Sequence, residues 1–286
     1  MAPHSIQRIV VATDFSRSAA VATEWAGRLA TTLGAELHLV HGWVLPVLVG
    51  PAGAYLAEVV TTGTLETELE TALTQAGAGH PVTGRHLLRM TPENAVQAVV
   101  KQVGADLVVV GAQGGSALEH VLFGSVAERI VRTAPAPVVV VPRAFEGALT
   151  RAVLVRSITA AIELAPSAHA VVGLARSLAR SLHAPLRVVH VAPDAPSDIE
   201  STRVLQGEMA QVLNAASEAR PEFETLELRR GDPATQLVLD GNHAGTDLIV
   251  MGSRGRRGLT RFFLGSVTER VIRDGHAPVL VLPPGS

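Results

Sequence analysis

The hydrophobic pattern alternates between short apolar runs and longer stretches with helical spacing, and this alternation occurs twice along the chain. Because the apolar runs are nearly continuous, we expect strands buried on both faces, as in parallel βαβ units. Strands are predicted at residues 8–13, 35–43, 86–90, 106–111 and 136–142, and again at 151–156, 184–192, 225–230, 247–252 and 277–283. Helices are predicted at 19–33, 64–76 and 92–103, at 166–182, 203–219 and 233–243, and before each last strand.

The two rounds of this pattern are an internal duplication. Residues 104–142 fall onto residues 245–283 without a gap, and about 18 of these 39 positions are identical. The join lies near residues 146–148. The sequence therefore predicts an α/β protein with two domains, residues 1–146 and 147–286, each a doubly wound five-stranded parallel sheet with flanking helices.

A glycine motif follows the fourth predicted strand of each half. Residues 111–125 and 252–266 both fit G-x₂-G-x₉-G-S. Ligands of open α/β sheets bind beyond the carboxyl ends of the strands, and the N–H groups at a helix N-terminus attract phosphate. Glycines at these points permit close approach of the backbone to a ligand. The motif therefore predicts two phosphate sites.

The same residues have a second interpretation as helix caps. Ser125 with Glu128, and Ser266 with Glu269, fit the S-x-x-E capping box, which needs no ligand. The two interpretations are compatible, because N–H groups beyond a cap can still face an anion.

Asp14 stands just after the first predicted strand, where its carboxylate could accept hydrogen bonds from a ribose or an adenine edge. The alternative is an N-cap or an Asx turn that leads into the helix. When residues 8–13 are matched to 151–156, Ser157 falls opposite Asp14, so the second half is expected to lack this charged acceptor.

These residues resemble the universal stress protein family, in its ATP-binding branch. The likeness rests on the glycine motif, the segment VVATDFS and the second strand LHLVHG, and it extends over the whole chain as two fused copies. It implies an adenine nucleotide alpha hydrolase-like fold and pairing of the two halves through their fifth strands as a pseudo-dimer. The nucleotide-binding residues that it implies are Ala12, Asp14, Gly42, Val110, Gly111, Gly114, Gly124, Ser125 and Val126, then Val155, Val191, Met251, Gly252, Gly255, Gly265, Ser266 and Val267.

The two glycine loops differ in charge. Arg254, Arg256, Arg257 and Arg261 lie in the second loop, whereas the first contains only Glu119 and His120. Arginines beside a phosphate site can clamp a polyphosphate, although a solvated basic loop needs no ligand. If both halves bind nucleotide, we expect these arginines to offset part of the affinity that is lost because Ser157 carries no carboxylate.

Composition excludes several other classes of protein. Lys+Arg number 24 against 26 Asp+Glu, and aromatic residues make up 3%, so nucleic-acid binding has little support. The chain has no cysteine, and the position of its one lysine, Lys101, does not fit a Walker-type phosphate loop. Residues 37–57 carry no charge, but their prolines and glycines favour a strand and an apolar loop over a membrane span. No secretory signal is visible, and we expect a cytoplasmic protein without metal ligands.

The leading hypothesis is a regulator of the stress response that binds ATP, with Mg²⁺ carried by the nucleotide, and that hydrolyses it slowly at most. One alternative is an ATPase or phosphoryl-transfer enzyme. Another is a nucleotide-free scaffold that binds a partner protein, and further association into a homodimer stays open. His41 and His190, at the ends of the second strands, are expected to be structural, and Trp25 and Trp43 are expected to pack in the core or a loop.

Overall fold

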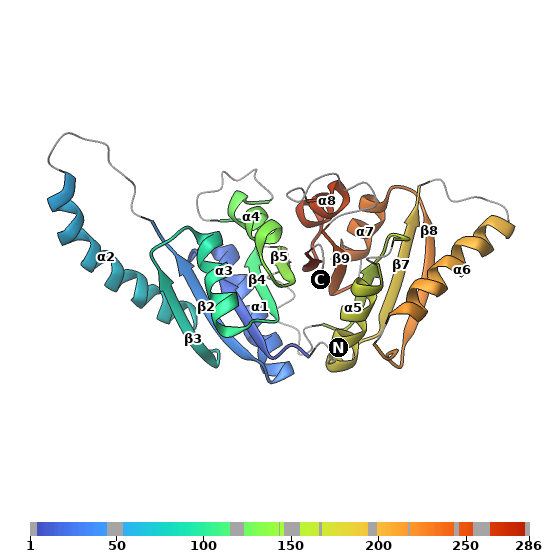
Figure 1. The fold of residues 1–286 in the computed structure, drawn as a ribbon, viewed down its shortest axis with the longest axis horizontal. Coiled ribbons are helices and arrows are strands. Elements are labelled where there is room, and N and C mark those ends of the chain that lie inside the picture. The colour runs from blue at the N-terminus through green and yellow to red at the C-terminus, as the bar shows by residue number, and fades with distance from the viewer. Residues whose placement is uncertain are drawn as a thin grey trace.

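The computed structural model of the chain describes residues 5–44, 54–114, 123–142, 144–145, 155–165, 168–193, 199–216, 218–242, 246–253 and 264–283. Within these residues the strands form one sheet of ten, in the order β3-β2-β1-β4-β5-β10-β9-β6-β7-β8 (Figure 1). The α/β class and the two doubly wound halves predicted from the sequence are confirmed. The strands of the first half are β1 (Arg8–Ala12), β2 (Glu36–Gly42), β3 (Val82–Leu88), β4 (Leu107–Gly111) and β5 (Val138–Val141). Those of the second half are β6 (Ile158–Ala161), β7 (Leu186–Ala192), β8 (Glu224–Arg230), β9 (Leu248–Gly252) and β10 (Val279–Leu282).

The halves join through their last strands. Within each half the neighbouring strands are parallel, whereas β5 and β10 pair antiparallel, with Val139 opposite Leu280. All residues of β5 and β10 are buried, so each strand covers an apolar edge that the other half would otherwise expose. The pairing through fifth strands that the family resemblance implied is therefore present within one chain.

Helices cover both faces of the sheet. Buried residues of α1, α2, α5 and α6 belong to one hydrophobic cluster, and those of α3, α4, α7 and α8 belong to a second cluster on the other face. Both clusters contain residues from the two halves, so the halves share their core. The helices are α1 (Arg17–Leu33), α2 (Ala54–Ala76), α3 (Pro92–Val103), α4 (Ser125–Thr133), α5 (Ala168–Leu182), α6 (Ile199–Ala215), α7 (Pro233–Asn242) and α8 (Ser266–Asp274).

Local sequence explains where the elements begin and end. The strand β4 is an unbroken apolar run, and its first four residues are buried because helices cover both of its faces. The helix α1 is capped by Ser16, whose hydroxyl accepts the N–H of Ala19, and it stops at Gly34, which takes the left-handed conformation with φ 65°. Trp25 lies wholly buried on the inner face of this helix, as expected for a core residue.

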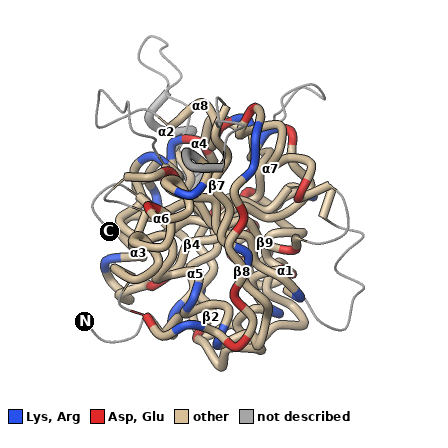
Figure 2. Tube along the Cα trace, turned by 90° about the vertical axis from the view of Figure 1, so that its right-hand side faces the viewer, with Lys and Arg blue, Asp and Glu red and all other residues tan. Residues whose placement is uncertain are grey.

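The second half contains a buried ion pair that has no counterpart among the described residues of the first half. Arg176 of α5 is 2% exposed, and its guanidinium donates to the carboxylate of Glu224 at 2.7 and 2.8 Å and to the carbonyl of Leu213 at 2.8 Å. These bonds tie α5 to α6 and to the start of β8. On the outer side of this half, acidic and basic segments are interleaved over β8 and its neighbours (Figure 2), as in the ion pair between Arg229 and Asp240 at 2.7 Å.

One predicted strand of the second half is misplaced. The strand expected at residues 151–156 is instead β6, Ile158–Ala161, where Ile158 pairs with Leu186 and with Leu248. Residues 155–157 have no strand conformation, and residues 151–154 lie outside the described part. The segment between the second and third strands is shorter in the second half, so the first strand of that half lies further along the chain than the match of 8–13 to 151–156 assumed.

Two helices also start earlier than their patterns predicted. The helix α2 begins at Ala54 and not near residue 64, and α6 begins at Ile199 and not near 203. In Figure 1, α2 extends beyond the edge strand β3. Part of the uncharged segment 37–57 is accounted for, because residues 36–42 form β2 and residues 54–57 belong to α2, whereas 45–53 lie outside the described part. None of the described helices combines the length and the apolar character that a membrane span requires.

Candidate functional site

The glycine motifs lie at the carboxyl edge of the sheet in both halves. The strand β4 ends at Gly111, and the N–H of Gly124, directly before α4, donates to the carbonyl of Ala112 at 2.8 Å. The second half repeats this contact, because the N–H of Gly265 donates to the carbonyl of Ser253 at 2.8 Å. In each half, therefore, the strand end and the helix start that flank the loop are joined.

The N-termini of α4 and α8 carry no side-chain cap. The N-cap residues are Gly124 and Gly265, both in extended conformation, and neither helix has a side-chain hydrogen bond at its cap. Ser125 and Ser266 are the first helical residues, and both are exposed. The predicted S-x-x-E capping boxes are therefore wrong, because each serine lies one position too late to cap. The N-terminal N–H groups and the positive end of the helix dipole remain suited to an anion.

Asp14 lies beside the glycine loop of the first half. A Cβ atom added to Gly114 would stand 2.9 Å from the Asp14 carboxylate, and one added to Gly124 would stand 3.5 Å from the Gly114 nitrogen. The structure thus brings Asp14, Gly114 and Gly124 together, although they come from three different segments. The exposed Asp14 also forms the predicted Asx turn, because its Oδ1 accepts the N–H of Ser16 at 3.1 Å.

Gly111 is required by the fold itself. A Cβ atom at this position would lie 2.6 Å from the Ser18 hydroxyl and 2.8 Å from the Ser18 backbone, so α1 can pack here only against a glycine. The same hydroxyl accepts the N–H of Gln113 at 3.2 Å, which fixes the start of the loop. Sequence reasoning missed Ser18, whose place at the start of the first helix carried no signal of this contact.

The remaining predicted residues of the first half line the strand ends in different ways. Ala12 is half-buried at the end of β1 and pairs with Val40. Val110 is 2% exposed and belongs to the core, whereas Val126 on α4 is half-buried. Gly42 ends β2 against α3, where an added Cβ would approach Pro92 and Ala95 within 2.8 and 2.9 Å. The absence of a larger side chain at residue 42 is thus explained by packing of α3.

Glu163, not Ser157, occupies the position of Asp14 in the second half. Ser157 precedes β6, and its carbonyl accepts the N–H of Asp247, as the carbonyl of Arg8 accepts that of Asp106. The N–H of Ile162 donates to Val189, as the N–H of Thr13 donates to Val40. The next residues along the chain are Glu163 and Asp14, and both are exposed. The second half therefore keeps a carboxylate at this edge, and the expected loss of charge is corrected.

Val155 does not lie at the predicted site, because the first strand of the second half was placed too early in the sequence. It is 3% exposed and precedes β6, at the amino edge of the sheet, whereas the residue that matches Ala12 is Ala161 at the carboxyl end. Val191 and Met251 are buried at the ends of β7 and β9, and Val267 is half-buried on α8. Gly252 accepts the Thr268 hydroxyl at 2.9 Å through its carbonyl. The predicted residues Gly255, Arg254, Arg256, Arg257, Arg261, Glu119 and His120 lie outside the described part.

The two strand-end histidines have the structural role predicted for them. Nδ1 of His41 lies 2.7 Å from the carbonyl oxygen of Thr13, and Nδ1 of His190 lies 2.9 Å from that of Ile162. Each histidine thus bonds a carbonyl 28 residues earlier, directly before the carboxylate. This equal spacing was the signal in the sequence that could have identified Glu163.

A polar cluster caps the N-terminus of α7 in the second half. Asp232 caps α7 by accepting the N–H of Thr235 at 2.8 Å, and Arg270 of α8 donates to the same carboxylate at 2.8 Å. The hydroxyl and N–H of Thr235 lower the pKa of Asp232, and Arg270 lowers it further. In the first half the N-cap residue Thr91 makes no such bond. The two halves thus differ at the N-termini of the equivalent helices α3 and α7.

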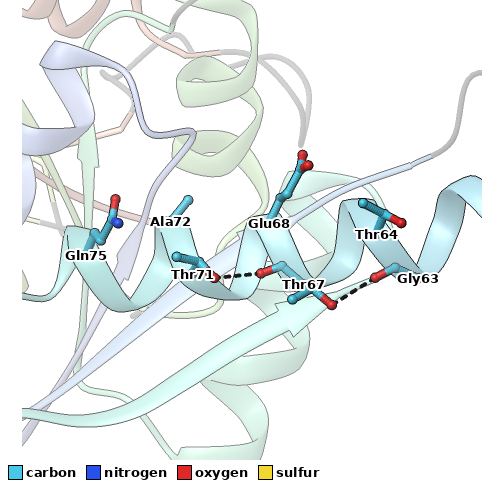
Figure 3. A pocket seen from close by; sticks show the side chains of 7 residues that line it. All are labelled: Gly63, Thr64, Thr67, Glu68, Thr71, Ala72 and Gln75. Atoms are coloured by element: carbon cyan, nitrogen blue, oxygen red, sulfur yellow. Dashed lines mark hydrogen bonds between the residues drawn. The ribbon is translucent and has the colours of Figure 1, made fainter.

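A separate groove of about 620 Å³ runs along α2 (Figure 3). Two hydroxyls of its lining are bonded within the helix itself. Those of Thr67 and Thr71 donate to backbone carbonyls one turn earlier, both at 2.9 Å. The groove lies on one helix and includes none of the strand-end residues. It is lined by Gly63, Thr64, Thr67, Glu68, Thr71, Ala72 and Gln75.

Comparisons with known proteins agree with this architecture. The sequence model described as the universal stress protein family matches residues 5–142 and 155–283. A universal stress protein of Mycolicibacterium smegmatis is 31% identical over 96% of this chain and 97% of its own length. One from Mycobacterium tuberculosis is 28% identical over 96% of this chain and 94% of its own length. The crystal structure of a universal stress protein from Archaeoglobus fulgidus has a TM-score of 0.67 at 20% identity and covers 98% of this chain and 97% of that one.

Proposed function

The chain belongs to the universal stress protein family, and from this premise we propose that it binds an adenine nucleotide, ATP with its Mg²⁺, at the carboxyl edge of both halves. In this proposal the bound nucleotide regulates the stress response in the cytoplasm, and hydrolysis is slow at most. A homodimer and a partner protein stay predictions.

The observation that carries the proposal is the convergence of Asp14, Gly114 and Gly124 at an uncapped helix N-terminus. The N–H groups of the first turn of α4 would hold phosphate oxygens, because they face the edge without a capping side chain. Asp14 would accept hydrogen bonds from the hydroxyls of the ribose. Gly114 and Gly124 would let the nucleotide approach the backbone, since neither carries a side chain in its path.

The second half supports the same proposal through different residues. Gly265 begins α8 as Gly124 begins α4, with the same contact to the preceding strand end. Glu163 supplies the carboxylate, one methylene longer than Asp14. We therefore propose two nucleotides per chain, with the longer side chain of Glu163 presenting its oxygens further from the backbone.

The experiment that tests this proposal places a carboxylate at the helix cap. Gly124 is an N-cap residue with φ −77°, and a Cβ added there makes only ordinary contacts, so Gly124→Asp fits the fold. Aspartate is also a better N-cap than glycine, so the variant should melt at the same temperature or higher. Its charge repels a phosphate, so nucleotide binding by the first half should be lost. Gly265→Asp should do the same in the second half.

Native mass spectrometry of the intact chain with millimolar ATP-Mg²⁺ gives the stoichiometry. We expect two nucleotides on the natural chain, one on each single variant and none on the double variant. Gly207→Asp on α6 is the matched control, because a side chain at residue 207 faces open space on a helix that packs against α5 and β8. No nucleotide on the natural chain would overturn the proposal, and rapid turnover abolished with binding would favour an ATPase.

A further inference from the structure

The residue after Asp14 has an unusual backbone conformation. Phe15 has φ 63°, and only His183 shares a positive φ among the described residues other than glycine. This left-handed conformation is unfavourable for a residue that carries a Cβ atom, so surrounding contacts must hold it. The Phe15 N–H donates to the Thr13 hydroxyl at 3.1 Å, and the next N–H, of Ser16, donates to the Asp14 carboxylate.

A pair of rings holds this turn in place. The Phe15 ring lies 4.5 Å from the His41 ring, centroid to centroid, and it packs against the hydrophobic core. His41 is fixed in turn by its contact with the Thr13 carbonyl at 2.7 Å. The residues directly before and after Asp14, Thr13 and Phe15, are therefore both held by His41.

The second half keeps only part of this arrangement. His190 makes the corresponding contact with the carbonyl of Ile162, but residue 162 has no hydroxyl. Leu164, which matches Phe15, is not among the described residues with positive φ. Between these two matched positions, the left-handed turn occurs only in the first half. This is also the half whose carboxylate, that of Asp14, has the shorter side chain.

We propose that Phe15 is a positioning residue for nucleotide binding in the first half. Its left-handed turn aims the Asp14 carboxylate at Gly114, and its ring, held by His41, keeps the turn closed before the ligand arrives. The inference rests on the proposed function, because it assigns how that same site is prepared. The carboxylate is held by the Ser16 N–H on one oxygen and lies beside the loop with the other.

The test uses the full chain with Gly265→Asp, so that only the first half binds. Phe15→Val introduces a β-branched residue that disfavours the left-handed turn, and we expect it to weaken ATP binding about 10-fold in calorimetry. Phe15→Gly adopts the left-handed turn without strain but lacks the ring, so its loss of affinity should be smaller than that of Phe15→Val. Phe15→Leu copies the second half and replaces the valine variant if that one melts early.

A double-mutant cycle separates positioning from general stability. If Phe15 acts through Asp14, adding Phe15→Val to Asp14→Asn should weaken binding no further than Asp14→Asn alone. Additive losses, unchanged affinity in Phe15→Val, or an equal loss in Phe15→Gly would each overturn the inference. Absence of binding by the chain that carries only Gly265→Asp would instead overturn the proposed function of the first half.

Discussion

At the scale of residues, the proposed function requires the carboxylates after β1 and β6 to contribute to nucleotide binding, each in its own half. Asp14→Asn should weaken nucleotide binding by the first half, and Glu163→Gln should weaken it in the second, each by about 10-fold or more. The reason is that a hydrogen bond to a charged acceptor contributes about 1.5–3 kcal/mol. Calorimetry with ATP measures each effect, in chains where Gly265→Asp or Gly124→Asp leaves only the half in question.

Ser157→Asp is the control for this pair. Its carboxylate would stand at the amino edge, where the Ser157 carbonyl accepts the N–H of Asp247, and ATP affinity should not change. A clear gain in affinity would mean that residue 157, and not 163, faces the nucleotide.

The glycines of the candidate site could be predicted from the sequence, whereas the carboxylate of the second half was missed. Gly124 and Gly265 follow their strands at equal spacing, and a repeated spacing can be recognised without knowledge of the fold. Glu163 was missed because residues 8–13 were matched to 151–156, which selects Ser157, whereas the first strand of the second half is Ile158–Ala161. The strand pairings of Ile158 correct this shift, because hydrogen-bond register identifies the true equivalents.

At the scale of elements, the edge strand β3 contacts β2 through two histidines, the buried His38 and the half-buried His86. Nδ1 of His38 lies 3.3 Å from Nε2 of His86, and Nε2 of His38 lies 3.5 Å from Glu36. Burial lowers the pKa of His86, and repulsion from His38 lowers it further. In the second half Arg187 takes the place of His38 and donates to the Thr159 hydroxyl at 3.2 Å.

Stability of the chain should therefore fall in mild acid through His86. Because the folded pKa lies below the unfolded value of about 6.5, the unfolded chain binds more protons between the two. The contribution of His86 is complete above about pH 6.5 and is lost as the pH falls through the folded pKa. Urea unfolding at pH 7.5 and 5.5 measures it, and His86→Gln should show a smaller loss than the natural chain. An equal loss in both would contradict the assignment to His86.

Helix starts show why some element boundaries were not predictable. The pattern S-x-x-E at residues 125–128 fits a capping box, but Gly124 already takes the extended conformation of the N-cap. The hydrogen bond from Gly124 to Ala112 sets that conformation, and it joins residues whose contact the sequence does not reveal. Tertiary contacts at the strand ends thus decide where α4 begins.

At the scale of the whole molecule, β5 and β10 make one sheet from two duplicated halves. Leu280 of β10 pairs with Val139 of β5 and is 1% exposed, and it belongs to a core cluster that includes residues of both halves. A destabilising substitution at this strand pair should therefore increase local unfolding in both halves, whereas one in a strand nearer the edge of the sheet should affect its own half alone.

Leu280→Ala tests this coupling, because truncation of a buried leucine costs about 2–5 kcal/mol. Hydrogen exchange followed by mass spectrometry should show faster exchange in β4 of the first half as well as in β9. Leu186→Ala is the matched control, since Leu186 is equally buried but lies in β7, between Ile158 and Glu224. It should speed exchange in the second half alone. If exchange in β4 is as slow in Leu280→Ala as in the natural chain, the halves unfold independently and the shared sheet does not couple them.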